Sequence, residues 1–196
     1  MNKSEDFQEA KERGIKLELY HGSGQKVEFP EIRKTKYTKD MKGVKLLMAT
    51  QWSKDDLFFV CSMIEYVARK THNKTKDVVG KLSDKALLHQ LKAAGVNHCL
   101  SFEQVCDEWI EQYGISEGSF DNITTCKYSV PSVTAIGRVY QILILDVMEL
   151  YENVVEAIKH VYNSFISEEI SDFNSNVYYS NPDYIKCSYE AGMLLD

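Results

Sequence analysis

The chain has 196 residues, of which 44% are hydrophobic and 27% are charged, so it can form a core and is too apolar for wholesale disorder. No apolar run approaches the roughly 20 residues of a membrane span, and the charged N-terminus does not resemble a signal peptide. Five irregularly spaced cysteines are typical of a reduced chain, and the formal net charge of −6 weakens the case for general nucleic-acid binding. We therefore expect a cytoplasmic protein that has no membrane segment.

Charge is distributed unevenly along the chain. Residues 1–52 contain 11 basic and 8 acidic side chains, residues 53–121 contain 8 and 11, and residues 122–196 contain 4 and 10. The sign of the charge changes near residue 50, where the hydrophobic pattern also changes. The sequence thus predicts two parts, a basic N-terminal segment over residues 1–50 and a second domain over residues 51–196.

The N-terminal segment contains one clear strand pattern. Ile15, Leu17 and Leu19 alternate with charged residues, which is typical of a half-buried strand. The strand runs into a turn with histidine and glycine at residues 21–24. We expect a short strand-turn segment here.

From Ser53 onward the sequence predicts helices. Ser53 and Asp56 form a capping box, in which each side chain can satisfy a free backbone amide at a helix start. Apolar side chains then recur at helical spacing, and the stripe consists of Leu57, Val60, Cys61, Ile64 and Ala68.

Two shorter helices are expected next. Thr75 would cap a helix that runs to Leu82, and Ser83 would start another that ends at Gly95. Three leucines of this second helix are expected to face inward: Leu87, Leu88 and Leu91.

A second capping box, Ser101 with Gln104, predicts a helix that ends at Gly114. Residues 115–131 lack a helical period, and residues 127–130 are expected to form a short strand.

Three further helices complete the prediction. The longest would run from Val133 to Leu150, and Asn153 would cap a helix that reaches Phe165. Asn181 would cap the last helix, with Pro182 at its first position. The predicted fold class is therefore mainly α, a helical bundle-like domain preceded by the strand-turn segment.

A basic stretch runs from Arg69 to Lys92, with seven basic residues against Asp77 and Asp84. Because two helices are expected in it, one interpretation is a helix-turn-helix that binds DNA. The other is a solvated face of a helical domain, which the acidic net charge favours.

Cysteine and histidine spacing predicts no metal site. Cys99 and Cys106 do not have the spacing of a zinc pattern, and no second pair of ligands follows them. Small packed thiols account for both residues.

The C-terminal third is rich in aromatic residues and carboxylates. Amphipathic aromatic side chains are favoured at protein interfaces. We expect a protein partner to bind five of them: Phe173, Tyr178, Tyr179, Tyr184 and Tyr189. The alternative is a segment that packs on the helical domain.

Three stretches near the N-terminus, LYHGS at 19–23, VEFPEI at 27–32 and KYTKD at 36–40, resemble the opening of a family of bacterial ADP-ribosyltransferase-like toxins. The resemblance implies an NAD-binding segment made of Tyr20, His21, Gly22 and Ser23. In that family the histidine binds ribose hydroxyls of NAD. This chain lacks the glycine-rich second strand that follows in the family, and reads MKGVKLLMAT at 41–50 instead. Residues 1–50 are thus similar to a truncated start of such a transferase.

The remainder of the chain resembles an uncharacterised family of small helical proteins from gut bacteria, encoded near the toxin-like family. Three stretches carry this resemblance: DLFFVCSMIEYVARKT at 56–71, VNHCLSFEQV at 96–105 and DFNSNVYY at 172–179. The resemblance implies no activity.

Together these features predict a non-catalytic interaction or regulatory protein of a bacterial toxin-like system, such as a toxin–antitoxin system. No cofactor is expected. Its partner would be a protein such as a toxin-like neighbour. One alternative is an NAD-dependent ADP-ribosyltransferase that uses His21, with Tyr178, Tyr179 and Glu190 as its least poor catalytic candidates. The other is a helix-turn-helix DNA-binding regulator that uses the basic stretch.

Overall fold

The computed structural model describes residues 19–20, 26–27 and 52–196. The chain divides into two units, Met1–Leu47 and Met48–Asp196. In the first unit, strand β1 (Leu19–Tyr20) pairs antiparallel with β2 (Lys26–Val27), with Leu19 opposite Val27. The rest of the predicted strand and its turn lie outside the described residues.

The second unit is mainly α-helical, which confirms the predicted fold class. Among the described residues, no helix is both long and apolar enough to cross a membrane. The elements of the second unit, in which η marks a 3-10 helix, are in chain order α2 (Lys54–Lys70), α3 (Thr75–Lys81), α4 (Asp84–Asn97), α5 (Phe102–Tyr113), α6 (Val133–Val147), η1 (Met148–Leu150), α7 (Val154–Asn163), α8 (Phe165–Ser171), η2 (Val177–Tyr179) and α9 (Pro182–Ala191).

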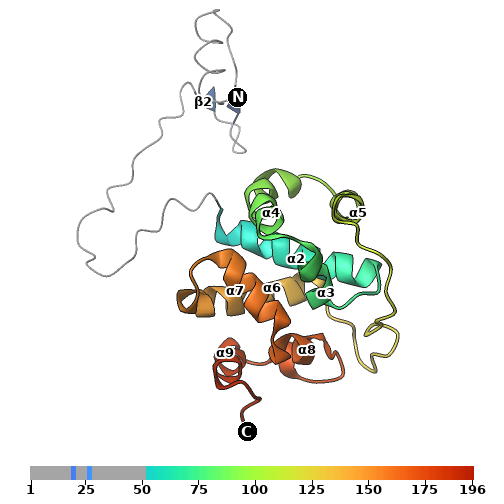
Figure 1. Cartoon of the computed structure of the whole chain (residues 1–196), viewed down its shortest axis with the longest axis vertical. Coiled ribbons are helices and arrows are strands. Elements are labelled where there is room, and N and C mark those ends of the chain that lie inside the picture. Colours follow the sequence, from blue (N-terminus) through green and yellow to red (C-terminus); the bar gives the residue numbers. More distant parts are fainter. Residues whose placement is uncertain (1–18, 21–25, 28–51) are drawn as a thin grey trace, which may run out of the picture. The chain divides into compact units, whose positions relative to one another are not determined.

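Helix α2 lies at the centre of this unit and packs against α3, α4, α5 and α6. Figure 1 shows α4 and α5 on one side of α2 and α6, with α8 and α9 on the opposite side. Helix α7 bridges the two groups, because it contacts α3 and α4 as well as α6 and α8.

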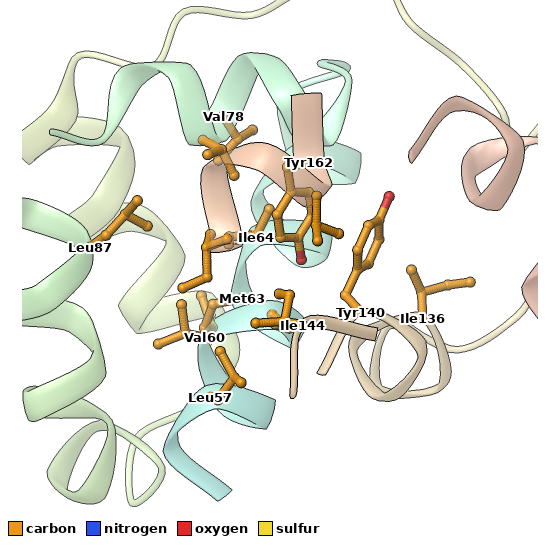
Figure 2. Close-up of a cluster of buried hydrophobic side chains, with 14 of the residues drawn as sticks. Leu57, Val60, Met63, Ile64, Val78, Leu87, Ile136, Tyr140, Ile144 and Tyr162 are labelled. Carbon is orange, nitrogen blue, oxygen red and sulfur yellow. The ribbon is translucent and has the colours of Figure 1, made fainter. Parts of the chain in front are cut away.

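The core forms where the apolar faces of these helices meet. Leu57, Val60, Ile64 and the rest of the predicted α2 stripe are buried, as the helical spacing indicated. The rings of Tyr140 from α6 and Tyr162 from α7 stack on each other, with centroids 4.1 Å apart, among these aliphatic side chains (Figure 2). The hydrophobic effect of this single core stabilises the arrangement of all the helices.

Local capping signals position the helix ends. Ser53 and Asp56 form the predicted capping box of α2, and Ser101 and Gln104 that of α5. Helix α5 ends at Gly114, whose φ of 60° is the left-handed conformation that glycine adopts without steric cost. The predicted caps of the later helices, at Asn153 and Asn181, are also confirmed.

Three expectations for α3 and α4 are wrong. Lys74, not Thr75, precedes the first turn of α3, and the Thr75 side chain is buried. Helix α4 continues past Gly95 to Asn97. Leu88 is 38% exposed, because it lies beside the buried face of α4, which consists of Leu87, Gln90, Leu91 and Ala94.

Three further expectations are wrong in the C-terminal half. Residues 127–130 form no strand, and Lys127 N donates to the Asn174 side chain after α8 rather than to a neighbouring strand. The helix predicted over 133–150 ends at Val147 and continues as the 3-10 turn η1, so α2 is longer than α6. Ser164, in an extended conformation, separates Phe165 from α7 and places it at the start of α8.

Candidate functional site

The loop of residues 115–131 positions the candidate site. One end of the loop lies along the α2–α3 connection, where Gly118 N donates to Thr71 O at 2.8 Å and Phe120 N donates to His72 O at 2.7 Å. The Asn73 side-chain amide also donates to Ser116 O at 2.8 Å. The loop forms no helix or strand of its own, and these bonds hold it against the helical core.

The other end of the loop is held by the segment that follows α8. Asn122 Nδ2 donates to Ser171 O at 2.8 Å. Lys127 N donates to Asn174 Oδ1 at 2.8 Å, and Asn174 Nδ2 donates to Thr125 O at 3.3 Å. Because one asparagine both accepts and donates, it fixes the register between two segments that are distant in sequence.

A surface groove lies between these two segments. Its lining, which we call the tyrosine groove, consists of Lys127, Tyr128, Ser129, Phe173, Asn174, Ser175, Asn176, Tyr178 and Tyr179. Tyr128 is 69% exposed and Tyr179 is 68% exposed, although large aromatic side chains are more often buried. The groove therefore offers two exposed aromatic side chains on a backbone that hydrogen bonds hold in place.

A chain of ring contacts connects the groove to the core. The Arg69 guanidinium lies over the Phe173 ring, 5.0 Å from its centroid. The Phe173 ring meets the edge of Tyr178 at 5.8 Å, and Tyr178 meets Tyr179 at 5.0 Å. Such edge-to-face contacts are favourable, so the exposed Tyr179 is held by the half-buried Tyr178, which in turn contacts the buried Phe173.

The five residues expected to bind a partner occupy different environments. Phe173 is 1% exposed and belongs to the core, so its part in any partner surface is indirect. Tyr184 and Tyr189 lie on α9, where the Tyr184 hydroxyl donates to Leu195 O at 3.0 Å and the Tyr189 hydroxyl contacts that of Tyr151. Burial and this contact raise the pKa of Tyr189. The structure brings Tyr178 and Tyr179 into the groove and leaves Tyr184 and Tyr189 outside its lining.

Tyr128 is the exposed aromatic residue of the groove that the sequence did not predict as a binding residue. The strand expected over residues 127–130 would place Tyr128 within a sheet. The available signal was the neighbouring Ser129 and the polar, irregular composition of residues 115–127, which favours a loop.

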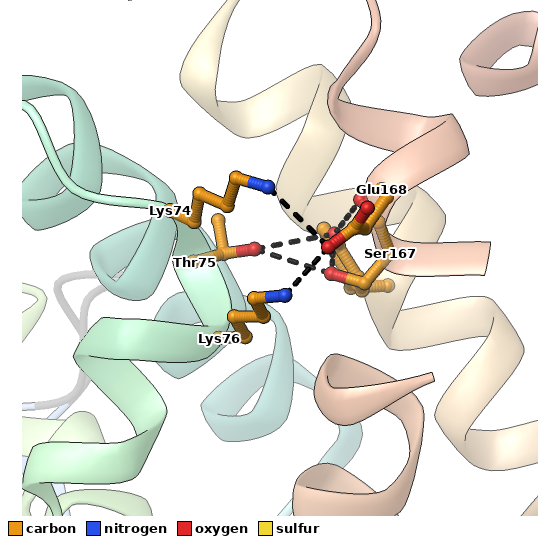
Figure 3. A network of polar contacts seen from close by, with 6 residues as sticks. Lys74, Thr75, Lys76, Ser167 and Glu168 are labelled. Carbon is orange, nitrogen blue, oxygen red and sulfur yellow. Dashed lines mark hydrogen bonds and ion pairs between the residues drawn. The ribbon is translucent and has the colours of Figure 1, made fainter. Parts of the chain in front are cut away.

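A polar network beside the groove engages part of the basic stretch. Lys74 Nζ lies 3.3 Å and Lys76 Nζ 2.5 Å from Glu168 Oε1 on α8 (Figure 3). The two ammonium groups lower the pKa of Glu168. Beneath them, the Thr75 hydroxyl lies 3.3 Å from Ser167 Oγ, and Ser167 Oγ lies 2.7 Å from the Tyr140 hydroxyl.

This network bears on the DNA-binding interpretation of the stretch from Arg69 to Lys92. Helices α3 and α4 form as expected, joined by Leu82 and Ser83. Two lysines of the stretch, however, share one carboxylate of α8, which offsets one of the positive charges that phosphate binding would need.

Two adjoining cavities lie under the loop. The Glu65 cavity has a volume of about 120 Å³, and its lining includes Glu65, Arg69, His72, Thr75 and Asp121. The Glu168 cavity has a volume of about 260 Å³, and its lining includes Lys74, Lys76, Glu168, Asp172 and Phe173. Both cavities share five lining residues: Thr75, Phe120, Asp121, Asn122 and Ser171.

The Glu65 cavity contains a buried ion pair. Arg69 Nε donates to Glu65 Oε1 at 2.7 Å, and the Glu65 side chain is only 4% exposed. Burial raises the pKa of Glu65, and the Arg69 guanidinium partly opposes this shift. Arg69 Nη1 donates to Pro131 O at 2.9 Å, whereas the buried Nη2 has no hydrogen-bond partner.

His72, at the edge of the same cavity, has a strained backbone. Its φ of 51° falls in the left-handed region, which costs a residue with a side chain roughly 1 kcal/mol or more. The hydrogen bonds that Gly118 N and Phe120 N donate to the α2–α3 connection hold His72 in this conformation. Strain of this kind gathers at ligand sites and switches.

We expect His72→Gly to raise the free energy of unfolding by about 0.5 to 1 kcal/mol, because glycine adopts this conformation without the steric cost. Urea denaturation followed by circular dichroism measures the change. Lys70→Gly, in the last turn of α2, is the matched control and should be destabilising by about 1 kcal/mol. If His72→Gly destabilises the protein as much as the control does, the His72 side chain contributes more to stability than its strained backbone costs, which would contradict the prediction.

The segment implied to bind NAD is described only in part. Tyr20 ends β1, whereas His21, Gly22 and Ser23 lie outside the described residues. Glu190 lies on α9, where its carboxylate is 4.0 Å from Lys186 Nζ. Within residues 52–196, no cluster of three or more His, Cys, Asp or Glu side chains could hold a metal ion. Cys99 is exposed, and burial raises the pKa of Cys106 to about 11.

Comparison with known proteins gave no matching family model, no matching curated protein and no matching solved structure.

Proposed function

We propose that this chain is a non-catalytic interaction or regulatory protein that binds a basic segment of a partner protein in the tyrosine groove. The observation that carries this proposal is the pair of exposed tyrosines, Tyr128 and Tyr179, on a preorganised surface. Tyrosine, serine and asparagine dominate the groove. The same residues are enriched in antibody binding loops, where tyrosine gives large contact area at low entropic cost.

The charge around the groove supports a basic partner. Residues 164–196 contain six carboxylates and a single lysine. Among these carboxylates, Asp172 and Asp183 are exposed. Opposite potentials steer association and raise the association rate, so a basic segment is attracted to this part of the surface.

The sequence resemblances supply the biological setting of the proposal. They imply a toxin-like system in which this chain binds a neighbouring toxin-like protein, as an antitoxin does. The ADP-ribosyltransferase and DNA-binding functions gain no comparable support, because most of the NAD segment lies outside the described residues and two lysines of the basic stretch are paired with Glu168.

The proposal is tested with the full chain and the purified product of the neighbouring toxin-like gene, by isothermal titration calorimetry. We expect Tyr128→Ala and Tyr179→Ala each to weaken binding by roughly tenfold or more, since aromatic residues in the centre of an interface often contribute over 1 kcal/mol. Both residues are exposed, so neither change should lower the thermal stability.

Leu150→Ala and Val96→Ala are the matched controls, because these side chains are 62% and 71% exposed and lie outside the groove. Neither control should alter the affinity. Absence of binding, or binding that both tyrosine variants leave unchanged, would contradict the proposal.

A further inference from the structure

The side of α4 that faces away from the core is basic. Residues three or four positions apart share one side of a helix, and here they form an exposed stripe of Lys85, Leu88, Lys92 and Val96. Asp84, the one carboxylate of α4, is already paired with Lys159. Among residues 52–196, no carboxylate lies within ion-pair distance of Lys85 or Lys92. The two lysines are therefore available to a negatively charged surface.

The outward side of the next helix, α5, is acidic. It contains no lysine or arginine, and its four carboxylates are all exposed: Glu103, Asp107, Glu108 and Glu111. Glu103 lies four positions from Asp107, which lies four positions from Glu111, and like charges at this spacing destabilise a helix. None of the four forms an ion pair within the part of the chain that the structure describes. Cations from another molecule would relieve this repulsion.

Helices α4 and α5 present these two sides together, on a surface that we call the α4–α5 face. Residues 98–101 join the helices, and both helices pack on α2, on the same side of α2 and α6 (Figure 1). The Gln90 side chain donates to the Tyr113 hydroxyl at 2.6 Å and so ties α4 to the end of α5. Val96 is 71% exposed and Leu100 is 40% exposed, and both lie where the helices join. The face therefore has a basic arm on α4, an apolar junction and an acidic arm on α5.

We propose that the α4–α5 face binds a second copy of this chain. A two-fold axis that runs between the two arms places α4 of each copy on α5 of the other. Lysines then face carboxylates twice, and the apolar side chains of the two junctions meet. DNA or an anionic membrane, in contrast, would be attracted to α4 but repelled by the four carboxylates of α5. No residue of this face lines the tyrosine groove, so the contact is independent of partner binding there.

The test is sedimentation velocity of the full chain at micromolar to millimolar concentrations. A reducing agent is present throughout, because Cys99 at the junction is exposed. We expect a monomer–dimer equilibrium. Its Kd should rise roughly tenfold between about 50 mM and about 500 mM salt, since salt screens contacts between exposed charges.

Charge reversal of each arm tests which surfaces meet. The α4 variant carries Lys85→Glu and Lys92→Glu, so that both arms are acidic. The α5 variant carries Glu103→Lys, Asp107→Lys and Glu111→Lys, so that both arms are basic. Each variant alone should dimerise roughly tenfold more weakly than the wild type or worse, because like charges then face each other.

An equimolar mixture of the α4 variant and the α5 variant is the decisive sample. The acidic α4 of the first meets the basic α5 of the second, and their two unaltered arms also have opposite charges. We expect a heterodimer with a Kd within about threefold of the wild-type value. The matched control carries Asp146→Lys, Glu149→Lys and Glu152→Lys, which changes the net charge as the α5 variant does at exposed positions outside the face, and it should dimerise as the wild type does.

The proposal is overturned if the wild type stays monomeric at about 1 mM, the weak end of specific association. It is also overturned if salt strengthens the dimer, if both variants dimerise as the wild type does, or if their mixture stays monomeric. A labelled DNA duplex and vesicles of anionic lipid are titrated in parallel. If a monomeric wild type binds either one and the α4 variant does not, the basic arm binds a polyanion and the proposal is wrong.

Discussion

Gly137→Ala should lower the free energy of unfolding by about 2 to 3 kcal/mol, because α2 and α6 approach too closely at this point to admit a methyl group. A Cβ at residue 137 would lie 2.8 Å from both Cα and N of Ser62. These are backbone atoms of the central helix, so they cannot move aside without shifting α2. Urea denaturation of the wild type and of the Gly137→Ala variant, followed by circular dichroism, measures the difference in the free energy of unfolding.

Gly80→Ala is the matched control for this prediction. Gly80 also lies in a helix, but a Cβ there would meet nothing within 4 Å. Alanine is the better helix former, so this change should raise stability by about 0.5 to 1 kcal/mol. Ser62→Ala in the Gly137→Ala background should restore little stability, because the backbone contacts remain. A neutral Gly137→Ala would show that the two helices are not in such close contact.

Arg69→Met should lower the free energy of unfolding by about 3 to 5 kcal/mol, the largest loss that we expect from a single substitution. The change removes the ion pair with Glu65, the hydrogen bond to Pro131 O and the contact with the Phe173 ring. It also leaves the Glu65 carboxylate buried without its cation. Chemical denaturation at neutral pH measures the loss.

Two comparisons separate the cost of the stranded charge from the cost of lost packing. Lys70→Met replaces the exposed neighbour of Arg69 and should change stability by less than about 0.5 kcal/mol. The double variant Glu65→Gln with Arg69→Met should be more stable than Arg69→Met alone, because no unpaired charge is then buried. Equal stability of the single and double variants would contradict the assignment of the loss to Glu65.

Local features of the sequence predicted the helix starts well. The capping boxes at Ser53 and Ser101 and the cap at Asn153 are each confirmed. A cap depends on side chains and amides within three positions of each other, so its signal is complete in the local sequence. The helical stripe of α2 was predicted for the same reason, because periodicity identifies which side chains share a face.

The predictions for Leu88 and Thr75 failed for one physical reason, which is the presence of a neighbour that is distant in sequence. Leu87 and Leu88 are equally hydrophobic, and only the direction from which α2 approaches decides that the first is buried and the second is partly exposed. Thr75 had the composition of a cap, but Tyr140 and Ser167 provide buried hydroxyl partners for its side chain. Neither neighbour could be inferred from residues near Thr75.

The sequence by itself determined that residues 52–196 are mainly helical, where most of their helices begin, and that aromatic side chains gather near the C-terminus. Only the tertiary structure decided what these parts can contact. Glu65 and Arg69 are an ordinary i, i+4 pair in the sequence, and become a buried pair at a cavity because the loop of residues 115–131 covers them. Tyr128 and Tyr179 meet in one groove because Asn174 bonds two segments that chain connectivity keeps apart, and local periodicity has no information about such contacts.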